Sequence, residues 1–194
     1  NYSKNYWKDY ALKFKQKYKK KDKILEIGCN DGFLLKHLNK KGFDTYGCDA
    51  SKFITNLFKN KKIKVMNYIF NLQNSKKISR RIGKVDYVIA NNVVNHSNNP
   101  DNFFKGVRNI LNNDGYFIFE QPYWLEMMKT SRIDQIYHEH ITYITLKFAK
   151  WLLEKNGMFI YNYEITEYHG GSLRIEARKK INYNKNAIMK IKKA

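Results

Sequence analysis

The sequence predicts an α/β fold, with a doubly wound, mostly parallel sheet that carries helices on both faces. Short, continuously apolar segments alternate with segments of helical spacing along most of the 194 residues. Strands that are apolar at every position are typical of a parallel sheet with two buried faces. Hydrophobic residues make up 43% of the chain, and its length suits one domain.

The N-terminal half begins with a predicted basic amphipathic helix at residues 1–22. Aromatic residues recur there at helical spacing among lysines, and we favour a helix that covers the core over one on a membrane surface. Two strand–helix units and a third strand are expected next, with strands at 24–28, 44–48 and 63–66 and helices at 32–40 and 51–59.

The second half continues the same alternation. A fully buried strand is predicted at 85–90, then a helix at 102–111 that ends in an Asn-Asn-Asp-Gly turn at 112–115, and a fifth strand at 116–120. A helix at 146–156 stops before a glycine, and later strands are expected at 158–165 and 172–177.

Composition and charge exclude several classes of protein. The net charge of +20 comes from 31 lysines and only 6 arginines among 37 basic residues, whereas nucleic-acid readers favour arginine, so a nucleic-acid partner is left open but not favoured. The two cysteines form no CxxC pair, which argues against a disulfide framework or a zinc finger. No apolar run of membrane-spanning length and no signal peptide are present, and we expect a cytoplasmic protein.

The first predicted strand runs into a turn that suits a nucleoside cofactor. Gly28 and Gly32 frame the turn, and Asp49 ends the second strand, where a carboxylate can accept both hydroxyls of a ribose. Asn30 stands where the dinucleotide motif GxGxxG has its middle glycine, which argues against NAD. With Glu26 before the turn, the pattern favours S-adenosylmethionine over an ordinary α/β turn.

Asn91 and Asn92 follow the fourth strand, at the end of the sheet where such folds bind ligands. They could hold the methionine part of the cofactor or the substrate, or they could only cap the next helix. The sequence leaves these alternatives open.

Four polar side chains gather at Tyr137, His138, Glu139 and His140. In an extended segment the two histidines would share one face, and in a loop all four could converge. We weigh a metal site completed by His96 or His169, a buried structural network, and a general base, and we favour the base without a metal. Further along, the segment 169–174 could bind a phosphate or a ketone oxygen, or form a glycine turn into a strand.

Taken together, these segments resemble the sugar C-methyltransferases that methylate C3 of nucleotide-linked 4-keto-deoxyhexoses. The order and spacing match from about residue 20 to 178. The segments that carry the resemblance are LEIGCNDG at 25–32, ANNV at 90–93, EQPY at 120–123, IYHEH at 136–140 and GGSLR at 170–174.

The resemblance implies a Rossmann-like class I methyltransferase fold, S-adenosylmethionine as cofactor and a sugar nucleotide as substrate. It implies that His140 is the base, with Tyr137 and Glu139 as its active-site partners. We expect Glu139 to hold the imidazole, and Tyr137 together with Arg174 to donate to the developing oxyanion. The cofactor domain would span 23–165, and 166–194 would begin a C-terminal region. Four further polar side chains are expected at the substrate: His96, Tyr123, His138 and Arg174.

The chain departs from that family in three respects. It has no cysteine-rich N-terminal zinc domain and no extended C-terminal domain, so we expect a piece of a longer protein or a reduced relative with another acceptor. Asn95 stands where the family often has a glutamate. The alternatives are a methyltransferase acting on RNA or another acceptor, and an inactive methyltransferase-like binding module; the oligomeric state is not predicted.

Overall fold

The computed structural model describes residues 2–19, 21–58 and 62–180. Its helices are α1 (Tyr2–Lys17), α2 (Phe33–Lys40), α3 (Lys52–Leu57), α4 (Leu72–Ile82), α5 (Pro100–Ile110), α6 (Trp124–Lys129) and α7 (Leu146–Lys155). Its strands are β1 (Lys23–Ile27), β2 (Asp44–Asp49), β3 (Lys64–Asn67), β4 (Val85–Asn91), β5 (Leu111–Pro122), β6 (Phe159–Thr166) and β7 (Ser172–Arg178). Short 3₁₀ turns are η1 (Val94–His96), η2 (Ile133–Gln135) and η3 (Tyr168–Gly170).

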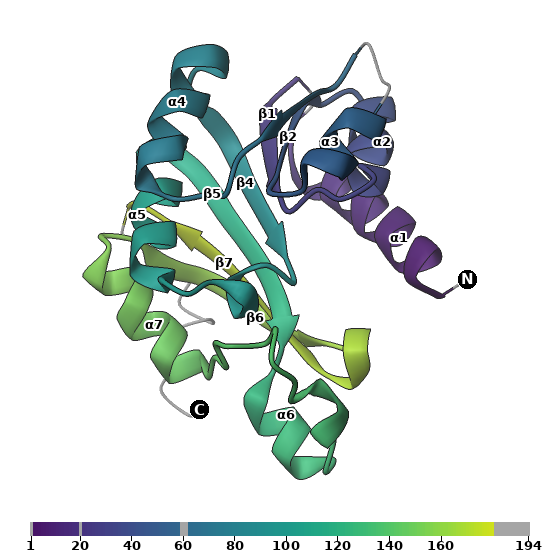
Figure 1. The fold of residues 1–194 in the computed structure, drawn as a ribbon, viewed down its shortest axis with the longest axis vertical. Helices are drawn as coiled ribbons and strands as arrows, with labels where there is room; N and C mark the ends of the chain where they lie inside the picture. Colours follow the sequence, from purple (N-terminus) through teal and green to yellow (C-terminus); the bar gives the residue numbers. More distant parts are fainter. Residues whose placement is uncertain (1, 20, 59–61, 181–194) are drawn as a thin grey trace.

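The strands form one seven-stranded sheet in the order β3-β2-β1-β4-β5-β7-β6. Strands β1 to β5 run parallel to one another, whereas β7 runs antiparallel to both β5 and β6. Helices α1, α2 and α3 lie on one side of the sheet, and α4, α5 and α7 on the other (Figure 1). The predicted α/β fold with a mostly parallel sheet is confirmed.

Both faces of the central strands are buried, which explains their uninterrupted apolar sequence. In β4, Val88 and Ala90 pack into the core under α4, α5 and α7, whereas Tyr87 and Ile89 face α1 and α2. On the second face, Phe14 of α1 contacts the ring of Tyr87 at a centroid distance of 5.1 Å. The N-terminal helix therefore covers the core, as predicted, and ends at Lys17.

Two predictions differ from the structure. Helix α4 was not expected, because its sequence is rich in lysine, arginine and serine; it buries only a narrow stripe, Ser75, Ile78 and Ile82, and Asn71 caps its first turn. The predicted turn at 112–115 lies inside β5, which begins directly after α5. Strand β5 bulges at this turn: Val85 of β4 pairs with Leu111, and Tyr87, two residues later, pairs with Tyr116.

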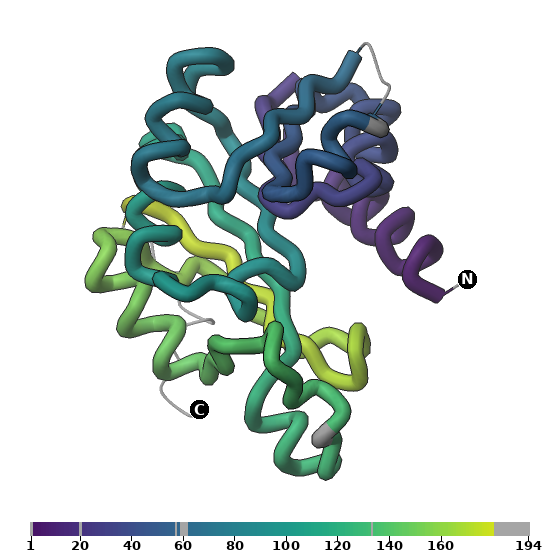
Figure 2. The backbone as a smooth tube through the Cα atoms, in the orientation of Figure 1, coloured from purple at the N-terminus to yellow at the C-terminus, as the bar shows by residue number. Residues whose placement is uncertain are grey.

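Figure 2 shows how the chain between β5 and α7 leaves the sheet, forms α6 and returns to the carboxyl ends of the strands. Residues 1 and 20 of the predicted first helix, residue 59 of the predicted third helix and residues 181–194 of the predicted C-terminal region lie outside the described residues. Within the described part, no helix combines the length and the apolar character needed to cross a membrane.

Candidate active site

Two adjoining cavities open at the carboxyl ends of β1, β2 and β4. The larger cavity, of about 590 Å³, has Asp49 and His96 in its wall. The smaller cavity, of about 290 Å³, has Glu26 in its wall and lies against α1. Three residues line both cavities: Gly28, Asn30 and Asn92. The two cavities are therefore the two ends of one groove, which is where open α/β sheets bind their ligands.

The turn after β1 requires its glycines. Gly28 and Gly32 have φ angles of 67° and 68°, in the left-handed region that side chains rarely adopt. A Cβ atom at Gly28 would also collide with the side chain of Val93. The missing side chain thus makes room for Val93, and the residue itself lines both cavities.

The carboxylate of Asp49 is fixed at the mouth of the larger cavity. It accepts hydrogen bonds from the main-chain N–H groups of Asn30, at 3.0 Å, and of Ser51, at 2.8 Å. Both donors are main-chain groups, so they orient the carboxylate without neutralising it with a cation. Asn30 contributes here through its backbone.

Several buried polar atoms at the groove have no partner within the described protein. They are both amide atoms of Asn91, Oδ1 of Asn92 and Oε2 of Glu26. Buried polar groups are nearly always hydrogen-bonded, so these atoms point to a ligand or to ordered water. Neither asparagine caps a helix: Asn99 caps α5 and η1 has no side-chain cap, which removes that alternative.

Glu26 is buried, and its charge state depends on what the groove holds. Burial raises its pKa well above the ordinary range, and the negative charges of Asp31 and Asp49 raise it further. A cationic group bound nearby would reverse this effect and favour the carboxylate. The residues therefore fit S-adenosylmethionine, which brings ribose hydroxyls, a carboxylate and two positive charges.

His140 lies in a loop and is held at both ring nitrogens. Its Nδ1 lies 2.9 Å from the carbonyl oxygen of Gln135, and its Nε2 lies 2.7 Å from the hydroxyl of Tyr137. A carbonyl oxygen only accepts, so Nδ1 carries the hydrogen, and in the neutral ring Nε2 accepts from Tyr137. Burial lowers the pKa of His140, and His96 lowers it further, which favours this neutral form.

The four polar side chains of the motif do not converge. His138 and Glu139 point away from the imidazole of His140, with side chains 90% and 64% exposed. The orienting group of the imidazole is the main-chain carbonyl of Gln135, so the expectation that Glu139 holds the ring is corrected. Sequence reasoning could not find Gln135, because a main-chain carbonyl leaves no signal in residue type.

The segment after β4 anchors the loop of His140. The main-chain oxygen of Asn95 accepts from the N–H groups of Ile141, at 2.9 Å, and Thr142, at 3.0 Å. Nδ1 of His96 lies 2.9 Å from the carbonyl oxygen of Glu139, and its ring meets that of His140 edge to face at 4.9 Å. Since His96 also lines the larger cavity, it joins the groove to His140.

Two other predicted substrate contacts lie elsewhere. Tyr123 is 7% exposed and packs in the core beneath α7. Arg174 makes its contacts with Glu120 and other residues between α1 and the sheet, and not with Tyr137 or His140. The paired glycines before Arg174 form the tight turn from η3 into β7, which is the simpler of the two interpretations. Across the described ranges, no three His, Cys, Asp or Glu side chains are grouped as a metal site requires.

Comparisons with known proteins agree with the geometry of the groove. Residues 2–161 match the family of methyltransferase domains. The C-methyltransferase NovU of Streptomyces niveus is 26% identical over 156 residues, which cover 80% of this chain and 37% of NovU. The chain thus spans little more than a third of the length of this curated relative.

Solved structures share the fold. The magnesium protoporphyrin IX methyltransferase of Synechocystis PCC 6803, solved with bound SAH, superposes with a TM-score of 0.70 at 15% identity, covering 92% of this chain and 84% of that one. A SAM-dependent methyltransferase from Archaeoglobus fulgidus superposes with a TM-score of 0.70 at 15% identity, covering 91% and 94% of the two chains.

Proposed function

Because the chain belongs to the family of methyltransferase domains and uses S-adenosylmethionine, we propose that it methylates C3 of a nucleotide-linked 4-keto-deoxy sugar through an enolate. The observation that carries the proposal is the imidazole of His140, which is hydrogen-bonded to Tyr137 and joined to the cofactor groove by His96. Methylation of a nitrogen needs no such base, whereas a carbon acid must lose a proton first. The match to NovU, which is named as a C-methyltransferase, supports methylation of a carbon atom.

The groove would hold the cofactor by its two ends. Asp49 would accept the ribose hydroxyls at the larger cavity, while Asn91, Asn92 and Glu26 would hold the amino-acid part at the smaller one. When bound, S-adenosylmethionine supplies a methyl group on a positively charged sulfur that leaves as a neutral thioether. Gly28 lines both ends of the groove, and its missing side chain lets Val93 pack beside the turn.

His140 would act as the base at C3 of the sugar. A hydrogen on the carbon next to a ketone is acidic, because the resulting anion delocalises onto oxygen. Nε2 takes this proton, and the positive charge that develops on the ring is stabilised through Nδ1–H by the carbonyl of Gln135. The low pKa of His140 keeps the ring able to accept at neutral pH.

Tyr137 would have two partners in turn. In the free protein its hydroxyl occupies Nε2, so the substrate must displace it before the proton can move. The released hydroxyl is then free to donate to the ketone oxygen, where the negative charge of the enolate accumulates. The side chain of Glu139 stays at the loop surface in the free protein, and His138 with it, where a sugar nucleotide could still contact them.

Deuterium exchange at C3 tests the proposal directly. A panel of nucleotide-linked 4-keto-deoxy sugars is incubated in D₂O with the chain and S-adenosylhomocysteine, and exchange is followed by NMR. We expect His140→Ala to slow exchange about 100-fold or more, the usual contribution of a general base, and His138→Ala, two residues away and exposed, to change it little. Exchange at the wild-type rate in His140→Ala would refute the assignment of the base.

A further inference from the structure

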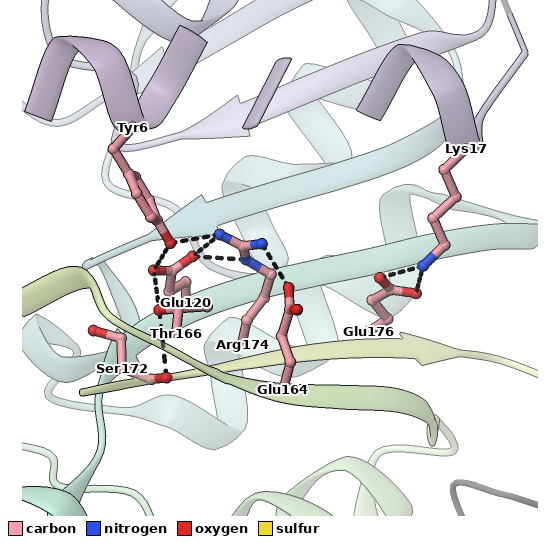
Figure 3. A network of polar contacts seen from close by, with 8 residues as sticks. All are labelled: Tyr6, Lys17, Glu120, Glu164, Thr166, Ser172, Arg174 and Glu176. Carbon is pink, nitrogen blue, oxygen red and sulfur yellow. Dashed lines mark hydrogen bonds and ion pairs between the residues drawn. The ribbon is translucent and has the colours of Figure 1, made fainter. Parts of the chain in front are cut away.

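Arg174 belongs to a buried polar network that the proposed reaction does not use. Its Nε and Nη2 bind Oε2 of Glu120 at 2.7 and 2.6 Å, and Nη1 binds Glu164 at 2.6 Å (Figure 3). The other carboxylate oxygen of Glu120 accepts from the hydroxyls of Tyr6, at 2.6 Å, and Thr166, at 3.0 Å. Glu120 is fully buried and the side chain of Arg174 is 12% exposed.

The network is already satisfied without a ligand. Both oxygens of Glu120 have two donors each, and Nη2 of Arg174 also reaches the hydroxyl of Tyr6 at 2.6 Å. A buried ion pair is retained only where such additional hydrogen bonds compensate its desolvation. An arginine with this many partners has little capacity left for a substrate oxygen, so its function lies in what it holds in place.

The network holds α1 against the sheet. Tyr6 provides the hydroxyl that Glu120 binds, and the guanidinium of Arg174 lies 4.6 Å from the ring centre of Tyr10, one turn further along the helix. A separate contact, Lys17 to Glu176 at 2.5 Å, fastens the far end of the same helix (Figure 3). Helix α1 therefore has one anchor near the groove and one remote from it.

The anchor near the groove, formed by Tyr6, Glu120 and Arg174, positions two aromatic rings in the wall of the smaller cavity. The ring of Tyr6 stacks on Tyr168 at 4.4 Å, and Trp7 meets Tyr168 at 5.0 Å. Trp7 and Tyr168 line the smaller cavity, the end that holds Glu26 and Asn91, and neither lines the larger one. Aromatic faces at this end suit the positive charges of the ligand.

We propose that Arg174 is a positioning residue that, through Glu120 and Tyr6, places the Trp7–Tyr168 wall at the amino-acid end of the cofactor groove. The inference concerns cofactor binding and is independent of the acceptor. If it is correct, substitutions that remove contacts of the network weaken the binding of the amino-acid part of the ligand and leave the binding of adenosine unchanged.

Two ligands separate these ends. S-adenosylhomocysteine and 5′-methylthioadenosine share the adenosine and the sulfur, but only the first has the amino-acid part. Calorimetric titration of each is carried out on the wild type and on Tyr6→Phe, Arg174→Lys and Arg174→Gln. The Tyr6→Phe variant keeps the stacked ring and removes one hydroxyl, so it should fold even if Arg174→Gln does not.

We expect Tyr6→Phe and Arg174→Lys to weaken S-adenosylhomocysteine about five- to tenfold, the size of one or two lost hydrogen bonds, with methylthioadenosine changed less than about twofold. Arg174→Gln should weaken S-adenosylhomocysteine more than Arg174→Lys does. The matched control is Lys17→Gln, which loosens the remote anchor of the same helix and should leave both affinities unchanged.

Equal weakening of both ligands, or the same loss in Lys17→Gln, would show a general loss of structure and overturn the proposal. So would unchanged S-adenosylhomocysteine affinity in Tyr6→Phe and Arg174→Lys. Failure of the wild type to bind S-adenosylhomocysteine would overturn the cofactor assignment instead. None of these outcomes depends on the sugar substrate, so the proposed reaction is tested separately.

Discussion

The hydroxyl of Tyr137 lies 2.7 Å from Nε2 of His140 and so occupies the nitrogen that would take a proton from the substrate. The opposite nitrogen is fixed by the carbonyl of Gln135. The imidazole thus has a set tautomer before any substrate arrives, and the phenol is the one partner that must move. The hydrogen bond between Tyr137 and Nε2 must therefore break before His140 can act as a base.

Replacing Tyr137 with phenylalanine separates the two functions of the phenol. Nε2 is then free from the start, but the hydroxyl that would stabilise the enolate oxygen is lost. We expect C3 exchange to fall about 100-fold, the usual cost of one oxyanion donor, without weaker S-adenosylhomocysteine binding. An exchange rate equal to or above that of the wild type would mean that Tyr137 only blocks the base.

The pH profile reports on His140. The reaction needs the neutral ring, and burial together with His96 lowers its pKa, whereas Glu139 and the carbonyl of Gln135 act in the opposite direction. Activity should therefore persist below the ordinary pKa of histidine and fall only on further acidification. His96→Gln removes one lowering influence, so the acid limb of the C3 exchange rate should move to higher pH. An unmoved or lowered limb would exclude the coupling of these two rings.

Glu26→Gln tests the charge at the smaller cavity. In the ligand-free protein the raised pKa of Glu26 favours the protonated acid, which glutamine imitates, so stability at pH 7 should be unchanged or higher. The bound ligand should lose a charge-assisted contact, and the affinity for S-adenosylhomocysteine should drop about tenfold or more. Thermal unfolding and calorimetry measure the two effects; a large loss of stability would contradict the reasoning.

Gly28→Ala should be costly for two reasons that a control can separate. Gly83 also has a positive φ, of 77°, with a ψ of −168°, and a Cβ there meets nothing closer than 3.6 Å, so Gly83→Ala carries backbone strain alone, about 1–3 kcal/mol in denaturant unfolding. Gly28→Ala adds the collision with Val93 and should cost more and abolish S-adenosylhomocysteine binding. The double variant with Val93→Ala should recover part of the difference. A double variant no more stable than Gly28→Ala would show that Val93 yields freely.

The strands of the fold could be predicted because successive residues of a strand face opposite sides of the sheet. Strand β4 was predicted because both its faces are apolar, and the two faces do pack into separate cores. Helix α4 was missed because its three buried positions stand among charged residues, and its stability depends on packing against α5 that the local sequence does not encode.

The candidate site also has a part that could be predicted from the sequence and a part that could not. Glu26 and Gly28 could be predicted from one strand–turn–helix pattern, and Asp49 because it ends the parallel strand beside β1. The surroundings of His140 and Arg174 could not, because their partners come from main-chain groups or from strands distant in the sequence. Arg174 pairs with Glu120 through the antiparallel register of β5 and β7, which no local pattern indicates.

The loop of His140 is tethered largely by main-chain atoms, through the carbonyls of Asn95 and Gln135. Such tethers survive substitution, since they do not depend on which side chains the tethering residues carry. The exposed residues beside the base, His138 and Glu139, can therefore diverge while the imidazole keeps its place. In evolutionary terms, the main-chain contacts preserve the position of His140, while selection for new acceptors can act on His138 and Glu139.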